Sequence, residues 1–408
     1  MKRSVVSMVM VCGATLAAAC AERPEDPQSD NSSSSSGGSG SSSGDAAGTS
    51  SSSSSGASGS SSGGSSGTVV DTGFRTDHEY VGCDEIGPGE GGQVLLAGHR
   101  KAAIFTAQGA LVPSFGSSGI LTPVPCEGGS CGSGFIQITL DGKGEGFYGL
   151  EVGGVTSSYG ALHRFAMDGA PTRISTEVNW MRMAAVDSNG DAYLIQSYIR
   201  GDGGALVRVS PSGEMTTLLS SVGGPAKPLT PEIGPFLRFH AVAHYGSAHY
   251  VLGTESDESE QRDNTIRQID DTGEVVSSFQ RVRVGGDEEN PGVRLRIGPD
   301  SLVIISENQA VIRDRNTGEM RHTISFVDRA FDAAVDENNR LYVTSGASRI
   351  LRYLPTGELD STFTPIDLGQ PPDVGERSIV LGLAQGRLLV SRCIQADVNT
   401  QTTYAFPR

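Results

Sequence analysis

The chain has 408 residues, with 47 acidic against 31 basic side chains and a formal net charge of −16 at pH 7. Neutralising phosphates requires clustered lysine and arginine, so this balance excludes a nucleic-acid binder that works through a basic face. Length alone would allow two or three domains, but composition changes sharply along the chain, and the domains have to be read from that change.

The first 19 residues have the pattern of an export signal. Lys2 and Arg3 precede a mostly apolar run from Val5 to Ala19. A helix of this length, at about 1.5 Å per residue, is too short for a hydrocarbon core of about 30 Å. We therefore expect a signal peptide in residues 1–19 rather than a membrane span.

Cys20 directly follows the apolar run. The segment from Leu16 to Cys20, Leu-Ala-Ala-Ala-Cys, resembles the lipobox of bacterial lipoproteins, although Ala17 and not a leucine stands three residues before the cysteine. The resemblance implies that the Cys20 thiol is lipidated, and Ala21, which is not an aspartate, implies sorting to the outer membrane. An ordinary secretory signal cleaved after Ala19 is the alternative, because small residues before the cut suit that peptidase too.

Residues 20–67 read as a tether. Between positions 31 and 67, 31 of 37 residues are Ser or Gly. Such a segment offers no apolar surface to offset the entropy of ordering, so we expect a disordered coil with a root-mean-square span of about 33 Å.

From residue 68 onward the chain repeats a turn with glycine at its apex. An apolar, alternating segment precedes the turn, as in a β-hairpin. The glycines follow one another at intervals of 39 to 60 residues: Gly109, Gly169, Gly213, Gly273, Gly318 and Gly357. Each period contains four short strand-like segments and no convincing amphipathic helix, which indicates the blades of a β-propeller.

The two ends of this region complete the count of blades. After Gly357 an incomplete unit follows, from Ile379 to Phe406, and the strand-like segment Thr68–Phe74 has no partner in the first unit. Placing Thr68–Phe74 as the outer strand of the last blade closes the ring and removes two exposed edges. We predict an all-β fold in which residues 68–408 form a seven-bladed β-propeller, with six blades as the alternative.

Two copies of the repeat resemble a known family. The segment Gly109–Thr122, preceded by Val94–Gly98, looks like the delta-60 repeat of bacterial secreted propeller-like proteins, and Tyr353–Phe363 is similar. Asp263–Arg267 looks as much like an NHL-type blade. The resemblance implies a propeller but no catalytic residues. Kelch and WD40 repeats are disfavoured, because Trp180 is the single tryptophan.

An arginine recurs five positions before four of the turn glycines. We expect these side chains to cover neighbouring blades with their stems rather than to bind a ligand: Arg164, Arg208, Arg313 and Arg352.

Four cysteines remain beyond the signal and Cys20. An even number in an exported domain indicates disulfides among Cys83, Cys126, Cys131 and Cys393. Three pairings are possible. If Cys83 pairs with Cys393, the bond joins the two ends of the ring, while Cys126 and Cys131 flank a short flexible loop. A zinc site is the alternative, with poor ligand spacing.

No catalytic motif is present, and we assign no catalytic residue, metal ligand or cofactor. His240 and His244, with His249 close behind, are the most suggestive cluster. On a regular strand His240 and His244 share a face about 13 Å apart, too far to share a metal, so ordinary blade histidines are favoured. Asp187–Asp191 resembles half of a calcium loop but lacks the bidentate glutamate.

Two classes of function remain. The first is a monomeric propeller, tethered to the membrane by its N-terminal lipid, that binds a protein, peptide or glycan through its loops. The second is an exported metal-dependent lactonase or lyase, which requires carboxylate, amide or imidazole side chains from several blades to converge on the central channel.

Overall fold

A computed structural model describes residues 73–98, 101–122, 135–152, 160–175, 178, 181–197, 204–220, 236–256, 262–286, 292–369, 376–384, 386–395 and 400–408. The expected signal peptide, Cys20, the whole of the expected tether (residues 20–67) and residues 68–72 lie outside these residues. In the described part, the fold is all-β apart from one short 3₁₀ turn, η1 (Glu90–Gly92), and no helix there is long and apolar enough to cross a membrane.

Twenty-eight strands form seven antiparallel, four-stranded sheets. Blade 1 contains β2 (Glu85–Pro88), β3 (Val94–Ala97), β4 (Ala102–Phe105) and β5 (Ile120–Leu121). Blade 2 contains β6 (Phe135–Leu140), β7 (Gly146–Val152), β8 (Gly160–Ala166) and β9 (Pro171–Ser175). Blade 3 contains β10 (Met181–Val186), β11 (Ala192–Ser197), β12 (Gly204–Val209) and β13 (Met215–Ser220).

The remaining blades follow in chain order. Blade 4 contains β14 (Phe236–Tyr245), β15 (Ala248–Ser256), β16 (Arg262–Ile269) and β17 (Val282–Val284). Blade 5 contains β18 (Arg294–Ile297), β19 (Ser301–Ile305), β20 (Gln309–Asp314) and β21 (Met320–Ser325). Blade 6 contains β22 (Ala333–Val335), β23 (Leu341–Ser345), β24 (Arg349–Tyr353) and β25 (Ile366–Asp367). Blade 7 contains β26 (Glu376–Ala384), β27 (Arg387–Gln395), β28 (Thr400–Pro407) and β1 (Phe74–Glu79).

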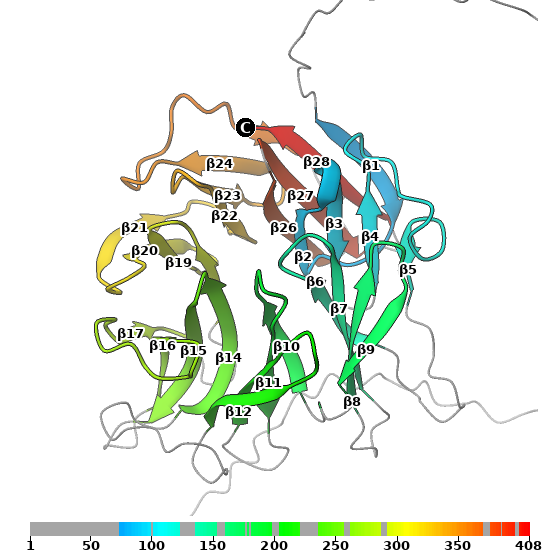
Figure 1. Ribbon diagram of the computed structural model, residues 1–408. Helices are drawn as coiled ribbons and strands as arrows, with labels where there is room; N and C mark the ends of the chain where they lie inside the picture. Colours follow the sequence, from blue (N-terminus) through cyan, green and yellow to red (C-terminus); the bar gives the residue numbers. More distant parts are fainter. Residues whose placement is uncertain are drawn as a thin grey trace, which may run out of the picture. The chain divides into compact units, whose positions relative to one another are not determined.

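The seven sheets follow one another around a common centre (Figure 1). The first strand of each blade contacts the first strand of the next, and β26 contacts β2, so the inner strands form a closed ring. The predicted seven-bladed propeller is therefore confirmed, and the alternative of six blades is wrong.

The last blade is completed by the N-terminal strand, but this strand lies further along the chain than predicted. Strand β1 pairs with β28 from Phe74↔Ala405 to Glu79↔Thr400. The expected strand Thr68–Phe74 therefore overlaps β1 at its final residue only, and residues 68–72 lie outside the described residues. An outer strand has one solvated face, and β1 is built from largely polar residues, so its extent could not be read from apolar residues alone.

All six repeat glycines lie in the turn between the third and fourth strands of a blade, and their φ angles lie between 76° and 88°. Residues with a Cβ rarely adopt this conformation, which explains the recurrence of glycine. Blade 7 has no such turn, because its third and fourth strands come from opposite ends of the chain. Seven blades therefore leave six copies of the motif.

The core is divided into seven clusters, one at each junction between neighbouring sheets. Successive residues of a strand point to opposite faces. Leu95 accordingly packs at the junction of blades 1 and 2, and Leu96 at the junction of blades 7 and 1. Strand β3, in the middle of blade 1, is thus apolar on both faces.

Three of the six glycine turns continue in the same way, with a phenylalanine six residues after the glycine. Phe115 and Phe279 are buried and Phe363 is partly buried, and each donates its backbone N–H to the carbonyl three residues earlier. Their rings pack on aromatic residues of second strands, namely Phe147, Tyr250 and Tyr342. The copy ending at Phe279 was not among the two predicted copies.

Candidate functional site

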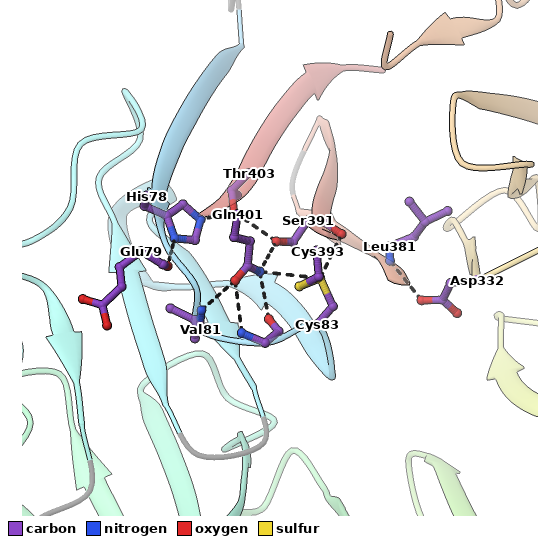
Figure 2. Close-up of a disulfide and its surroundings, with 11 residues drawn as sticks. His78, Glu79, Val81, Cys83, Asp332, Leu381, Ser391, Cys393, Gln401 and Thr403 are labelled. Carbon is purple, nitrogen blue, oxygen red and sulfur yellow. Dashed lines mark hydrogen bonds between the residues drawn. A yellow bond between two sulfur atoms is a disulfide. The ribbon is translucent and has the colours of Figure 1, made fainter. Parts of the chain in front are cut away.

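The seam of the ring holds a disulfide between Cys83 and Cys393, whose sulfurs are 2.10 Å apart (Figure 2). Cys393 lies on β27, and Cys83 lies in the segment between β1 and β2. The bond therefore links two positions separated by 310 residues in the sequence. Cys126 and Cys131 lie outside the described residues, so their pairing stays a prediction.

Gln401 on β28 connects the same two chain ends through its buried amide. Its Oε1 accepts hydrogen bonds from the N–H groups of Val81 (2.8 Å) and Gly82 (3.1 Å), and its Nε2 donates to the Gly82 carbonyl (2.8 Å) and to Ser391 Oγ (2.6 Å). A buried polar network with each member paired fixes local geometry. These hydrogen bonds hold the two chain ends together, and the groups that form them do not make a reactive site.

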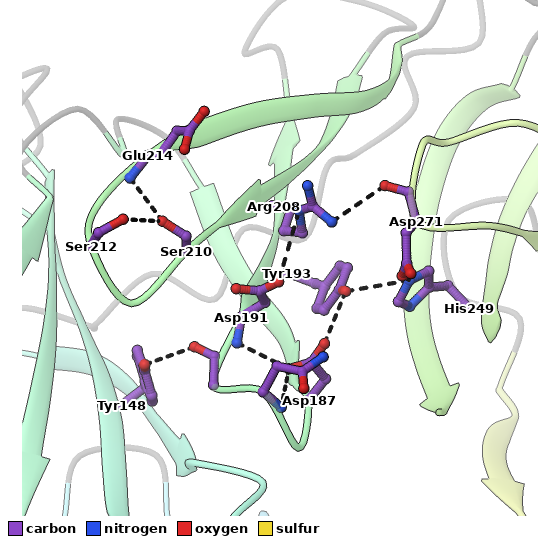
Figure 3. Close-up of polar contacts among 12 residues, drawn as sticks. Tyr148, Asp187, Asp191, Tyr193, Arg208, Ser210, Ser212, Glu214, His249 and Asp271 are labelled. Carbon is purple, nitrogen blue, oxygen red and sulfur yellow. Dashed lines mark hydrogen bonds and ion pairs between the residues drawn. The ribbon is translucent and has the colours of Figure 1, made fainter. Parts of the chain in front are cut away.

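A second polar cluster lies at the junction of blades 3 and 4 (Figure 3). Tyr193 on β11 donates its hydroxyl proton to Asp187 Oδ2 (3.2 Å), and His249 Nε2 on β15 lies 3.3 Å from the same hydroxyl and 2.8 Å from Asp271 Oδ1. Burial, followed by the nearby Asp187 carboxylate, raises the pKa of Tyr193, and burial lowers the pKa of His244. At neutral pH the Tyr193 hydroxyl therefore keeps its proton and the His244 ring stays neutral.

The histidines are distributed differently from the prediction. A β-bulge between Phe239 and Ala241 interrupts the alternation of β14. His244 pairs across the sheet with His249, their rings 6.4 Å apart, whereas His240 Nε2 contacts Thr254 Oγ1 at 2.8 Å. The expectation that His240 and His244 share one face of a regular strand is therefore replaced by two separate environments.

Asp187 serves as the cap of a hairpin turn. Its Oδ1 accepts the N–H groups of Asn189 (2.8 Å) and Asp191 (3.0 Å), while Oδ2 accepts the Tyr193 hydroxyl. Asp336 caps the corresponding turn of blade 6 in the same way. Among the described residues, no group of three or more His, Cys, Asp or Glu side chains could hold a metal ion.

Polar side chains on the inner strands join one blade to the next. Glu85 accepts hydrogen bonds from Thr139 and from the N–H of Leu140, and Gln137 exchanges two hydrogen bonds with the backbone of Met183. Further round the ring, Arg182 donates to the carbonyl oxygens of Phe239 and His240, and Asp332 binds Arg296 and the N–H of Leu381. These described side chains hold neighbouring blades together, and their contacts do not favour the lactonase or lyase alternative.

The four recurrent arginines do not share one environment. Arg164 pairs with Asp141 at 3.1 Å, Arg208 with Asp191 at 3.9 Å, and Arg352 with Asp360 at 2.7 Å. Arg313 donates from Nη1 to the Gly318 carbonyl at 2.8 Å, but its Nε is buried without a partner. In the described part of the chain no carboxylate lies within ion-pair distance of Arg313.

Arg313 lines a pocket of about 380 Å³ between blades 4 and 5. One wall is the outer strand of blade 4 and the residues after it, from Arg283 to Gly286. The other wall comes from blade 5, where Ile304 and Val311 are cross-strand neighbours on β19 and β20. Apolar walls with a few polar groups are typical of small-ligand sites. The recurrent arginines were predicted as structural, and nothing in the sequence distinguishes Arg313 from the three that are paired.

No protein-family model matches the chain, and no curated protein matches it in sequence. Solved structures of other proteins are similar in fold. Sqt1 of Saccharomyces cerevisiae is 11% identical, covers 82% of this chain and 98% of its own, and has a TM-score of 0.48. BamB of Moraxella catarrhalis is 11% identical, with coverages of 78% and 81% and a TM-score of 0.41.

A gluconolactonase of Xanthomonas campestris is 13% identical, with coverages of 60% and 79% and a TM-score of 0.36. At these identities the likeness concerns the fold alone. Membership of the delta-60 or NHL-like repeat families is accordingly not shown.

Proposed function

We propose that this protein is a lipid-anchored propeller of the bacterial outer membrane that binds a ligand in the pocket between blades 4 and 5. The pocket is the observation that carries the proposal, because it combines a volume of about 380 Å³, apolar walls and an arginine that has no carboxylate partner among the described residues. Binding modules need such a site and no reactive constellation. The propeller acts as a monomer, and its repeats belong with the delta-60 type.

Export and anchoring are supported by three features. The sequence places Cys20 directly after an apolar signal and before a Ser/Gly-rich tether. A disulfide between Cys83 and Cys393 fits an oxidising compartment. The sequence predicts that the tether is a coil with a span of about 33 Å, which is long enough to keep the propeller clear of lipid head groups.

Substitution of the anchor cysteine tests the tether. In membrane fractionation we expect the wild-type protein in the outer-membrane fraction and Cys20→Ser in the soluble fraction, because one thioether-linked lipid group holds the chain. Cys12→Ser, which changes a cysteine within the signal, is the matched control and should stay with the membrane. Wild-type protein with a free Cys20 thiol in the soluble fraction would contradict the proposal.

Narrowing the pocket tests binding. A Cβ added at Gly285 meets no atom within 4 Å, and the backbone there is not in the left-handed region, so the fold can accept Gly285→Leu. We expect a library of small neutral and charged compounds to yield binders by ligand-observed NMR with the full-length chain, and their signals to disappear with Gly285→Leu. A library without binders, or binders that Gly285→Leu does not affect, would contradict a binding function for this pocket.

A further inference from the structure

The pocket between blades 4 and 5 has a distinctive charge. Its lining includes two charged side chains, and both are arginines, Arg283 and Arg313, in a chain whose net charge is −16. The remaining lining is apolar or uncharged and includes Val284, Ile304 and Val311. An anionic group with an apolar body is the ligand that such a surface complements.

The two arginines differ in what they can still bind. Arg283 is largely exposed and already pairs with Asp263 at 3.2 Å, and Asp263 also lies 4.0 Å from Arg281. Arg313 is half-buried, and among the described residues its one hydrogen bond goes to the neutral carbonyl of Gly318. In the described residues, Arg313 therefore has guanidinium hydrogen-bonding capacity that no acidic side chain uses.

Among the four recurrent arginines, only the one in blade 5 lacks a carboxylate partner in the described residues. The equivalent arginines of blades 2, 3 and 6 face carboxylates of their own turns. The same position in blades 1 and 4 holds Ile104 and Gln268, so the fold does not require a cation there. A partly buried guanidinium without a counter-charge costs free energy; among the described residues Arg313 has none, and burial lowers its pKa. A ligand that brings the missing charge would offset this cost.

We propose that the pocket binds a small carboxylic acid with an apolar body, which places its carboxylate on Arg313 and its body against Ile304 and Val311. Arginine is suited to this role because its planar fork forms two parallel hydrogen bonds to a carboxylate. The inference rests on the proposed binding function and specifies the chemical class of its ligand.

Matched acids and amides test the proposal. Phenylacetate and octanoate, each beside its uncharged amide, are titrated into the purified full-length chain and followed by isothermal titration calorimetry. We expect at least one acid to bind and its amide to bind about tenfold more weakly or not at all, since hydrogen bonds to a charged group are worth about 1.5–3 kcal/mol.

Two variants locate the binding. Arg313→Gln should weaken the acid about tenfold while leaving the amide unchanged, and Gly285→Leu should abolish binding of both. Arg208→Gln removes the equivalent arginine of blade 3, which is far from the pocket lining, and should change neither.

The outcomes separate this inference from the proposed function. Acids that bind no better than their amides, or acids whose affinity Arg313→Gln does not change, overturn the assignment of a carboxylate ligand. If neutral compounds still bind and Gly285→Leu still removes them, the pocket remains a binding site for another class. If neither acids nor neutral compounds bind, both proposals are overturned.

Discussion

At the scale of single residues, identical positions in a repeat carry different energetic roles. Arg352 donates from Nε to Asp360 Oδ2 at 2.8 Å and also pairs through Nη2, whereas Arg313 has no carboxylate partner among the described residues. Removing a partner from a buried ion pair leaves an uncompensated charge, whereas removing an unpaired buried charge does not. A side chain that costs stability where it stands is a candidate for function.

Thermal unfolding distinguishes these roles. We expect Arg313→Met to keep or raise the melting temperature, because a methionine fills similar space without a buried charge. Arg352→Met should lower it, because Asp360 loses its ion pair. Differential scanning calorimetry of the full-length chain measures both. A drop in Arg313→Met as large as that in Arg352→Met would show that Arg313 is a structural residue.

His244 gives a residue-level prediction for pH. Burial lowers its pKa below the ordinary value of 6.5, so the folded state keeps the ring neutral while the unfolded state takes up a proton as the pH falls below about 6.5. The unfolded state then binds more protons, and stability is lost as the pH falls from about 6.5 through the folded pKa.

Replacing the ring removes this contribution. Urea unfolding at about pH 7 and pH 5 should show a larger loss of free energy of unfolding for the wild type than for His244→Gln. Burial also lowers the pKa of His78 and His163, and both are present in both proteins, so the comparison isolates His244. The same loss in the two proteins would mean that His244 does not contribute.

At the scale of elements, the repeated glycine turn was predicted at all six copies, whereas the bulge in β14 and the bounds of β1 were not predicted. A glycine that must adopt positive φ leaves a residue-type signal at every copy. The bulge in β14 leaves none, since it depends on how the partner strand is paired, and it separated His240 from His244. The end of β1 was also placed too early, at Phe74 instead of Glu79, because an outer strand is chosen by pairing with β28 rather than by its own apolar residues.

The phenylalanine that ends three of the turns was recognised in two. The third copy, Gly273 to Phe279, has Val275 where the others have leucine, yet Phe279 closes the turn in the same way. A shared backbone hydrogen bond and an aromatic neighbour thus define the motif better than its letters do. The neighbour belongs to the same blade for Phe279 and Phe363 and to the next blade for Phe115. The structure therefore groups blades 1, 4 and 6 by the geometry of this turn.

Truncating this ring tests the role of the motif. Phe279 is 3% exposed and packs on Tyr250, so Phe279→Ala should reduce the free energy of unfolding by about 3–5 kcal/mol. Leu359, at 55% exposure in the equivalent turn of blade 6, is the control, and Leu359→Ala should change it by no more than about 0.5 kcal/mol. Chemical denaturation measures both, and equal effects would contradict a core role for Phe279.

At the scale of the whole molecule, the propeller has one junction that differs from the others. Six blades are continuous in sequence, and blade 7 takes β1 from one end of the chain and three strands from the other. Fold class, blade number and this closure followed from counting repeats. The pocket between blades 4 and 5 did not, because it depends on how the side chains of two neighbouring sheets leave space, which repeat counting does not describe.

Closure from both ends makes blade 7 the place where unfolding is expected to begin, since opening it requires only the loss of the β1–β28 pairing. The Cys83–Cys393 bond opposes this opening by joining positions 310 residues apart. For a loop of this length the chain-entropy model gives about 5 kcal/mol as an upper value, because residual structure in the unfolded chain reduces the gain.

Loss of the Cys83–Cys393 bond should therefore lower the free energy of unfolding far more than loss of a disulfide that closes a short loop. We expect Cys393→Ser to reproduce most of the decrease in melting temperature caused by reducing the wild-type protein, and hydrogen exchange in β1 and β28 to accelerate first. Cys131→Ser, which changes a cysteine of the short Cys126–Cys131 segment, is the control and should leave the melting temperature nearly unchanged. Peptide mapping without reductant identifies the pairs directly. Recovery of Cys83 joined to Cys126 or Cys131, or a melting temperature that Cys393→Ser does not change, would show that the ring is held closed by strand pairing and the Gln401 network alone.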